Sequence, residues 1–172
     1  WVVKLSTTGT IQWQNTIGGS SYDYLRSIQQ TTDGGYILGG YSQSGISGDK
    51  TEASQIQGDY WVVKLSTTGT IQWQNTIGGS GADNLQSIQQ TTDSGYILGG
   101  DSNSIISGDK MENNHGYNDY WVIKLSSFTN AKALFSVSNE IIYPNIPTTI
   151  ANASLNASSY QWQVDGVPVS TD

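Results

Sequence analysis

Carboxylates that recur at a fixed spacing are the side chains best suited to chemistry in this 172-residue sequence. One set of acidic residues is repeated 60 positions later in the chain. Carboxylate oxygens are the ligands that calcium prefers, so part of each set is a candidate calcium site. The candidate metal ligands are Asp49, Glu52, Asp59, Asp109, Glu112 and Asp119.

The spacing of these acids does not match the Asp-x-Asp-x-Asp-Gly pattern of a dedicated calcium loop. A glycosidase needs two carboxyl groups held about 5–10 Å apart in a cleft, and no pair in the sequence is singled out for that role. Asp33 and Asp93 are interpreted as turn residues, because each stands beside glycine between two strand-like segments. Calcium is therefore the one candidate cofactor.

The sequence gives little support for catalysis by a thiol, a zinc ion or a Ser-His-Asp set. The chain has one histidine, His115, and no cysteine, so neither a thiol nucleophile nor a usual zinc site can be assembled from these residues. Gln55 stands at the position of His115 in the other copy, and no Ser-His-Asp set is repeated. We expect His115 to be a surface residue and predict that these residues have no enzymatic activity.

The charge balance limits the kinds of partner. A net charge of −7 disfavours a phosphate backbone, so we expect no nucleic acid partner. No apolar run approaches the ~20 residues of a membrane span, so we expect no membrane insertion. The chain opens with Trp1 inside a strand-like segment, which indicates a piece of a longer protein.

A tandem repeat positions the acidic residues. Residues 1–60 align with 61–120 without a gap, residues 1–20 are identical to 61–80, and a third copy opens at 121. Each period contains four strand candidates, and the complete set spans 25–32, 36–42, 60–65 and 71–77. The turn glycine Gly69 is expected to take a positive φ. In the turn between segments 25–32 and 36–42, we expect Gly35 and its counterpart Gly95 to take the positive φ, because Ser94 stands in the second copy at the position of Gly34.

Four antiparallel strands per period favour a β-propeller blade, and the fold class is all-β. Residues 1–127 are predicted to form a partial β-propeller of four-stranded antiparallel blades, which stack through Trp61, Trp73 and Gly39-Gly40. A two-sheet sandwich and a β-solenoid are the alternatives. Two periods cannot close a ring of roughly 4–8 blades, so the parent chain would supply the remaining blades, or several copies would associate.

Three motifs carry a family resemblance: Gly-Gly-Tyr-Ile-Leu-Gly-Gly at 34–40, Asp-Tyr-Trp-Val-Val-Lys-Leu at 59–65 and Gly-Thr-Ile-Gln-Trp at 69–73. Their order resembles the kelch-type repeat. Residues 1–126 also resemble the tandem repeats of secreted or cell-surface proteins of Bacteroidetes-type bacteria. The resemblance implies a propeller, export through a type nine secretion route and an extracellular location, but no activity.

The pattern changes after Leu125. Residues 128–134 are predicted to be a linker, and residues 135–172 resemble the first strands of a polycystic-kidney-disease-like or immunoglobulin-like domain. Tyr160, Trp162 and Val164 alternate with polar residues, and Asp165-Gly166 is a hairpin signal. This segment is well short of the ~100 residues of such a domain, so we expect a truncated β-sandwich.

The expected function is inferred from the end of the blade at which the sequence differs between copies of the repeat. The long loop 43–58 and the connection 18–24 should lie at one end of the blade, and the tight turns should lie at the other. Several positions at the loop end differ between copies, which is typical of a binding surface. We predict a non-enzymatic binding or display module that contacts polysaccharide or an extracellular protein. The alternative is an accessory module of an extracellular glycan-degrading enzyme. The candidate ligand-facing residues are Tyr22, Tyr24, Tyr41 and Tyr117.

Overall fold

A computed structural model describes residues 1–55, 57–126, 135–137, 150–152, 161–164 and 167–171. The described residues contain strands, turns and loops but no helix, so the all-β prediction is confirmed. The chain divides into two units, Trp1–Ser127 and Phe128–Asp172. The predicted linker at 128–134 lies outside the described residues.

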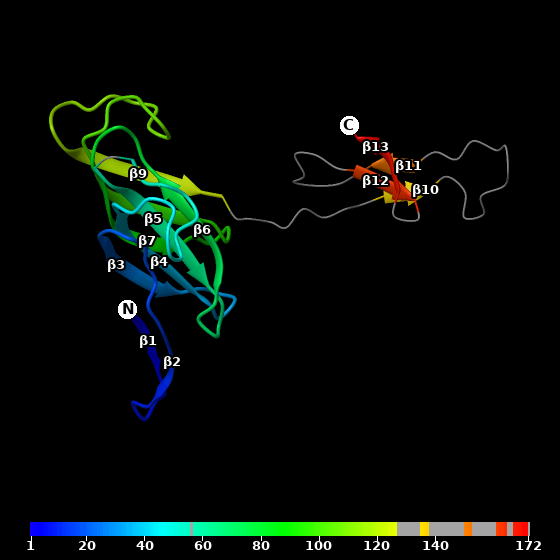
Figure 1. Ribbon diagram of the computed structural model, residues 1–172, viewed down its shortest axis with the longest axis horizontal. Helices are drawn as coiled ribbons and strands as arrows, with labels where there is room; N and C mark the ends of the chain where they lie inside the picture. The colour runs from blue at the N-terminus through cyan, green and yellow to red at the C-terminus, as the bar shows by residue number, and fades with distance from the viewer. Residues whose placement is uncertain (56, 127–134, 138–149, 153–160, 165–166, 172) are drawn as a thin grey trace. The chain divides into compact units, whose positions relative to one another are not determined.

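The first unit contains three antiparallel sheets (Figure 1), and the four-stranded sheet begins in the first copy of the repeat and ends in the second. Strands β1 (Val2–Leu5) and β2 (Ile11–Asn15) form a hairpin. The complete period gives a four-stranded sheet in sequential order, as predicted: β3 (Asp23–Gln30), β4 (Tyr36–Ser42), β5 (Asp59–Leu65) and β6 (Ile71–Ile77). The next period gives a three-stranded sheet: β7 (Asp83–Gln90), β8 (Tyr96–Ser102) and β9 (Asp119–Leu125).

Strand β5 is buried on both faces because it lies between two neighbouring sheets. Tyr60 and Val62 belong to a core that includes residues of β7 and β8. Trp61 and Val63 alternate with them and pack on the opposite side, against the β1–β2 hairpin. The prediction that Trp61 joins the two large sheets is therefore wrong, since the indole points toward the hairpin. Trp73 does pack in the core between these sheets.

Gly39 lies where the two large sheets approach each other most closely. A Cβ atom added there would lie 2.6 Å from Cδ2 of Leu85 and 3.0 Å from Cγ2 of Ile88. Any side chain at this position would force the sheets apart, which confirms the expectation of a close approach. Gly40 has a different reason, because its added Cβ would lie 1.8 Å from the carbonyl oxygen of Tyr24, beside the β-bulge in β3.

In the turn between β3 and β4, the predicted position of the positive φ is wrong. The positive φ occurs at Gly34 (81°) and at its counterpart Ser94 (63°), not at the glycines that follow. Gly35 is required for space instead, because an added Cβ would lie 2.3 Å from the Leu65 carbonyl oxygen. Serine therefore bears the left-handed backbone at a modest cost, whereas the position of Gly35 admits no side chain at all.

An ion pair joins this turn to β5. The Lys64 ammonium is buried and lies 2.9 Å from a carboxylate oxygen of Asp33, and it also donates to Gln72 and to the Leu65 carbonyl. Hydrogen bonds from Thr31 and Lys64 lower the pKa of Asp33 to about 2. The second copy repeats the pair between Lys124 and Asp93 at 2.8 Å. These aspartates are thus turn residues that also neutralise a lysine.

The second unit is described only as four short strands in two antiparallel pairs. Strand β10 (Phe135–Val137) pairs with β11 (Ile150–Asn152), and β12 (Gln161–Val164) pairs with β13 (Val167–Thr171). The predicted hairpin around 165–166 is confirmed by the pairing of Val164 with Val167. The sandwich itself stays a prediction.

Replacing Trp73 by alanine tests the packing between the large sheets. The indole lies edge-on to Tyr96, with ring centroids 5.7 Å apart, and it packs against the core they share. We expect a loss of about 3 kcal/mol in the free energy of unfolding, measured by urea denaturation. Trp73→Phe should recover most of the loss, and a cost below about 1 kcal/mol for the alanine variant would contradict the packing.

The two ion pairs provide a matched test of burial. The Lys64 side chain is 4% exposed and the Lys124 side chain is 40% exposed. Asp33→Asn should cost about 1–2 kcal/mol because it leaves a buried ammonium less well satisfied. Asp93→Asn should cost less, since water solvates its partner lysine. Equal changes in urea midpoint for the two variants would contradict this explanation.

Candidate functional site

The polar loops gather at one end of the repeat, as predicted. Backbone hydrogen bonds join the connection that leads into β3 to the loop after β4: Asp49 N–H donates to the Gly18 carbonyl over 2.9 Å. The hydroxyl of Ser47 accepts from Ser20 N–H over 2.9 Å. The second copy repeats the pairing with Asp109 N–H and Gly78. At the other end, the added Cβ of Gly34 would lie 3.2 Å from Thr67, so the tight turns are also together.

Four aspartates at the first position of a strand share one structural task. Each carboxylate accepts a hydrogen bond from the backbone N–H four residues earlier, over 2.6–2.7 Å. Such charge-assisted bonds fix the approach of a loop to its strand. Sequence reasoning missed this pattern, although the repeated aspartate at the start of alternate strands could have indicated it. The four are Asp23, Asp59, Asp83 and Asp119.

Other acids of the loop end also bind backbone. A carboxylate oxygen of Asp49 accepts from Gly18 N–H over 3.2 Å, and Asp109 does the same for Gly78 N–H over 3.0 Å. Glu52 accepts from Thr76 N–H, on β6, over 2.6 Å. In the second copy, the backbone carbonyl of Glu112 accepts from Lys110.

These contacts bear on the calcium hypothesis. Within residues 1–55 and 57–126, no three histidine or acidic side chains come together as a group that could hold a metal ion. Asp49, Glu52 and Asp59 each accept a hydrogen bond from a different backbone N–H instead. Calcium binding therefore stays a prediction with no assembled ligand set in the described part of the chain.

The loop after β4 contains a buried lysine, Lys50. The Lys50 ammonium donates to the hydroxyl of Thr76 and stands 5.1 Å from the centroid of the Trp61 ring. Burial lowers the pKa of this ammonium, while the charges of Asp59, Asp23 and Glu52 oppose the shift. The lysine anchors the loop through cation–π and polar contacts.

Asp59 is the most perturbed carboxyl in this region. Burial raises its pKa to about 6, and the nearby charge of Asp83 acts in the same direction. Its Oδ2 accepts from Gln55 N–H, whereas Oδ1 is buried with no hydrogen-bond partner among the described residues. Ionisation of this carboxyl is therefore unfavourable in the folded protein.

A pH titration tests the burial of Asp59. Between its ordinary pKa of 3.8 and about 6, the folded state binds more protons than the unfolded state, so stability falls as pH rises through this range. Asp59→Asn should reduce that fall in melting temperature, measured by circular dichroism. Asp119→Asn removes the equivalent hydrogen bond at a half-buried position and should keep the wild-type dependence of melting temperature on pH. An unchanged slope in Asp59→Asn would contradict the assignment.

Three of the four predicted ligand-facing tyrosines form a row. Tyr22 stacks on Tyr24 with ring centroids 6.1 Å apart, and Tyr24 stacks on Tyr41 at 4.9 Å. The guanidinium of Arg26 stands 5.7 Å from the Tyr24 ring centroid and 5.6 Å from that of Tyr41. Tyr22 and Tyr24 are exposed. We call these four residues the tyrosine row.

The remaining predicted residues lie in the long loop before β9. Tyr117 is exposed, and its backbone carbonyl accepts from the side chain of Asn114. His115 is exposed, as expected, and its backbone N–H donates to Asp119. The structure does not bring Tyr117 into the tyrosine row, which is formed by residues of β3, β4 and the connection before β3.

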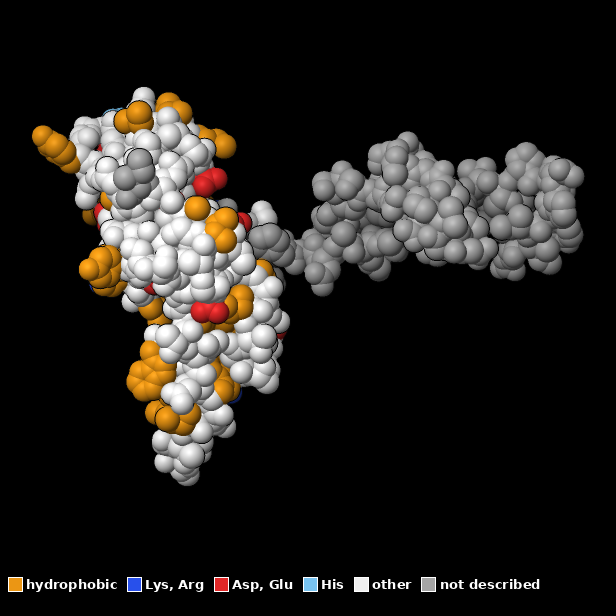
Figure 2. All heavy atoms as spheres, viewed as in Figure 1, with side chains coloured by type: hydrophobic (Ala, Val, Ile, Leu, Met, Phe, Trp, Pro, Cys, Tyr) orange, Lys and Arg blue, Asp and Glu red, His pale blue; other side chains and the backbone are white. Residues whose placement is uncertain are grey.

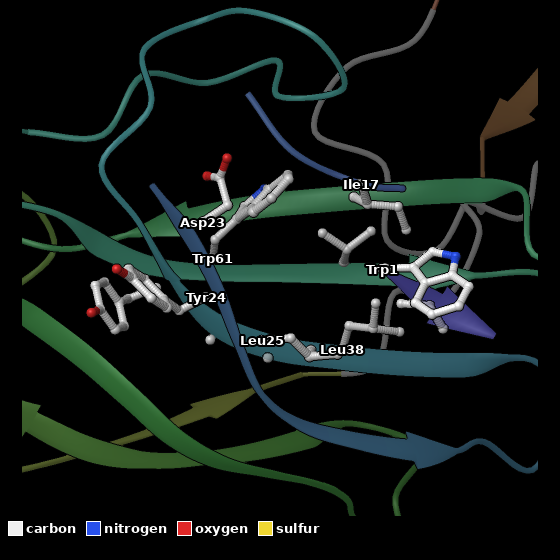
Figure 3. A pocket seen from close by; sticks show the side chains of 12 residues that line it. Trp1, Ile17, Asp23, Tyr24, Leu25, Leu38 and Trp61 are labelled. Atoms are coloured by element: carbon white, nitrogen blue, oxygen red, sulfur yellow. The ribbon is translucent and has the colours of Figure 1, made fainter. Parts of the chain in front are cut away.

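A pocket of about 60 Å³ with both apolar and polar lining residues, Asp23 among them, lies between the β1–β2 hairpin and the four-stranded sheet (Figure 3). Leu25, Leu38 and Trp61 line it from the sheet, and Ile17 and Trp1 line it from the other side. Tyr24 contributes to the rim, but its ring points away from the pocket (Figure 3). Sequence reasoning did not predict this pocket.

Comparison of the chain with protein-family models and with curated proteins finds no match. The kelch-like and polycystic-kidney-disease-like resemblances therefore stay predictions. Among the described residues there is also no helix long and apolar enough to cross a bilayer.

Proposed function

We propose that this chain is a non-enzymatic binding module and that the tyrosine row is its ligand-contacting surface. The observation that carries the proposal is the row itself, three rings stacked on one another with two of them exposed. Exposed aromatic rings on paired strands offer rigid apolar faces at low cost in conformational entropy. Such faces suit the flat apolar side of a sugar ring, so polysaccharide is the proposed ligand class.

The second copy of the repeat serves as an internal control. It has the same strands and the same register, yet Ala82, Asn84, Gln86 and Asp101 occupy the positions of the row. The fold therefore does not require aromatic residues there. Exposed aromatic residues that the fold does not need are candidates for recognition.

We further propose that the sheets are blades of a β-propeller in a secreted or cell-surface protein, followed by a sandwich-type domain. Successive antiparallel sheets that pack face to face support this architecture. The parent chain would supply the remaining blades. The alternative function is that of an accessory module of an extracellular glycan-degrading enzyme, with its catalytic domain outside these residues, and the tyrosine row would serve there too.

Affinity electrophoresis in gels that contain soluble neutral or acidic polysaccharides tests the proposed ligand class. At least one polysaccharide should retard the 172-residue chain. Tyr24→Ala removes the central ring of the row and should lower the affinity about five- to tenfold, because a lost stacking contact is worth roughly 1–1.5 kcal/mol. Asn84→Ala, at the equivalent position of the second copy, should bind like the wild type.

Two results would contradict the proposal. One is the absence of retardation by every polysaccharide in the panel. The other is equal retardation of Tyr24→Ala and the wild type, which would place the binding elsewhere on the chain. The melting temperatures of both variants should remain near that of the wild type, since the row lies outside both cores.

A further inference from the structure

The tyrosine row contains the only arginine of the sequence, Arg26. Its side chain is exposed, and its guanidinium stands 5.7 Å from the Tyr24 ring centroid and 5.6 Å from that of Tyr41. Within the described part of the chain, this guanidinium forms no ion pair and donates no hydrogen bond. A guanidinium has five N–H donors, so those of Arg26 remain available to solvent or to a ligand.

A β-bulge in β3 places the guanidinium beside the rings. The register of β3 with β4 shifts at Arg26, which is the additional residue of the bulge. Tyr24 stands two residues earlier, and residues two apart share one face of a strand. Tyr24 is also paired directly with Tyr41 on β4, so both rings lie on that face. The bulge thus sets one cation on a platform of two aromatic rings.

This face of the four-stranded sheet is the one on which β7–β9 pack. Tyr41 is paired with Tyr60 on β5, and the Tyr60 hydroxyl donates to the Trp121 carbonyl on β9. With this neighbouring sheet in place, Tyr22 is still 65% exposed and Tyr24 43% exposed. The tyrosine row is therefore an open surface beside a packed interface.

The equivalent side chains of the second copy satisfy one another. Asn84 Nδ2 donates to a carboxylate oxygen of Asp101 over 3.0 Å, and Gln86 Nε2 donates to the other oxygen over 3.5 Å. These three residues stand at the positions of the central tyrosine, the tyrosine of β4 and the arginine. The second copy thus has an acid at the position where the first copy has a ring, and the guanidinium of the first copy lacks that partner.

The acid next to Tyr24 in the sequence does not neutralise Arg26. The carboxylate of Asp23 accepts hydrogen bonds from the hydroxyls of Ser42 and Ser44. It points away from the Tyr24 ring (Figure 3). The chain as a whole carries a net charge of −7, and Figure 2 shows acidic and hydrophobic side chains on the first unit but hardly any basic ones. The row therefore has a charge opposite to that of the chain.

We propose, on the basis of the function proposed above, that the polysaccharide is acidic and that Arg26 binds the carboxylate of a uronic acid. In a uronic acid the carboxylate is bonded directly to the sugar ring, so the charge stays beside the ring that contacts the tyrosines. The planar carboxylate also matches the two parallel donors of a guanidinium. The tyrosines supply affinity for the sugar ring, and the arginine selects a charged sugar over a neutral one.

Isothermal titration calorimetry of the full 172-residue chain tests this selection. The ligands are hexasaccharides of alginate, polygalacturonate and hyaluronate, each beside its carboxyl-reduced form, which keeps the linkages but is less charged. About 0.15 M salt screens charges that lie more than about 8 Å apart, so contact with Arg26 dominates. At least one acidic hexasaccharide should bind about fivefold more tightly than its reduced form, as expected for a well-placed exposed ion pair.

Three variants separate the guanidinium from the overall charge. Arg26→Gln introduces the residue of the second copy, so it should remove the preference for the acidic form and keep the affinity for the reduced form. Arg26→Lys keeps the charge without the paired donors and should retain part of the preference. Lys124→Gln changes the net charge equally, but Lys124 pairs with Asp93 in the β7–β8 turn, so the wild-type preference should remain.

Equal affinity of the wild type for acidic and reduced forms would overturn the uronic acid proposal. An undiminished preference in Arg26→Gln, or its loss in Lys124→Gln, would do the same. If Tyr24→Ala still weakens binding in any of these cases, the tyrosine row remains a polysaccharide site without selection by charge. Absence of binding to every hexasaccharide would overturn both this proposal and the proposed function.

Discussion

The close approach of β7 to Gly39 is the constraint on which the rest of the repeat structure depends. Because position 39 has no side chain, Leu85 and Ile88 reach the backbone of β4, and the two sheets share one core. Tyr60 can then span the gap and bond to the Trp121 carbonyl, and the face of β5 that carries Tyr60 and Val62 becomes buried. A sheet with one wet face would not need the continuous apolar run of β5. The continuous apolar run of that strand thus matches its two covered faces, one packed on β7 and β8 and the other on the β1–β2 hairpin.

Besides forming ion pairs with lysines, the carboxylates of this chain hold its polar loops in place. Loops with few apolar residues cannot be held by packing, so hydrogen bonds to backbone must fix them. Aspartates at the first position of alternate strands bind the N–H four residues earlier, and Asp49 and Asp109 bind the preceding connection. A buried carboxyl such as Asp59 and a buried ammonium such as Lys50 are the electrostatic cost of this arrangement.

Strand positions, their antiparallel order and the two ends of the repeat could be predicted, because the alternation and the exact repeat length encode them. The orientation of Trp61 could not, since alternation shows that Trp61 and Tyr60 face opposite ways but not which neighbour each one meets. The positive φ was assigned to the wrong residue of this turn, because a serine at position 94 suggested that this position does not need a left-handed backbone. Ser94 nevertheless adopts the left-handed backbone, with a φ of 63°. The tyrosine row was partly predictable from sequence differences between copies, but nothing in the sequence places the guanidinium of Arg26 against two rings.

Glu52 has a consequence for lateral growth of the sheets. The outer edge of β6 would present free backbone donors to any extended chain, and such edges promote aggregation. The Glu52 carboxylate occupies Thr76 N–H, while Gln74, also on β6, bonds to the Asp49 carbonyl. The loop after β4 thus shields β6 with side chains that a foreign strand would have to displace. This protection covers the edge of β6 and leaves the faces of the sheets able to pack against their neighbours.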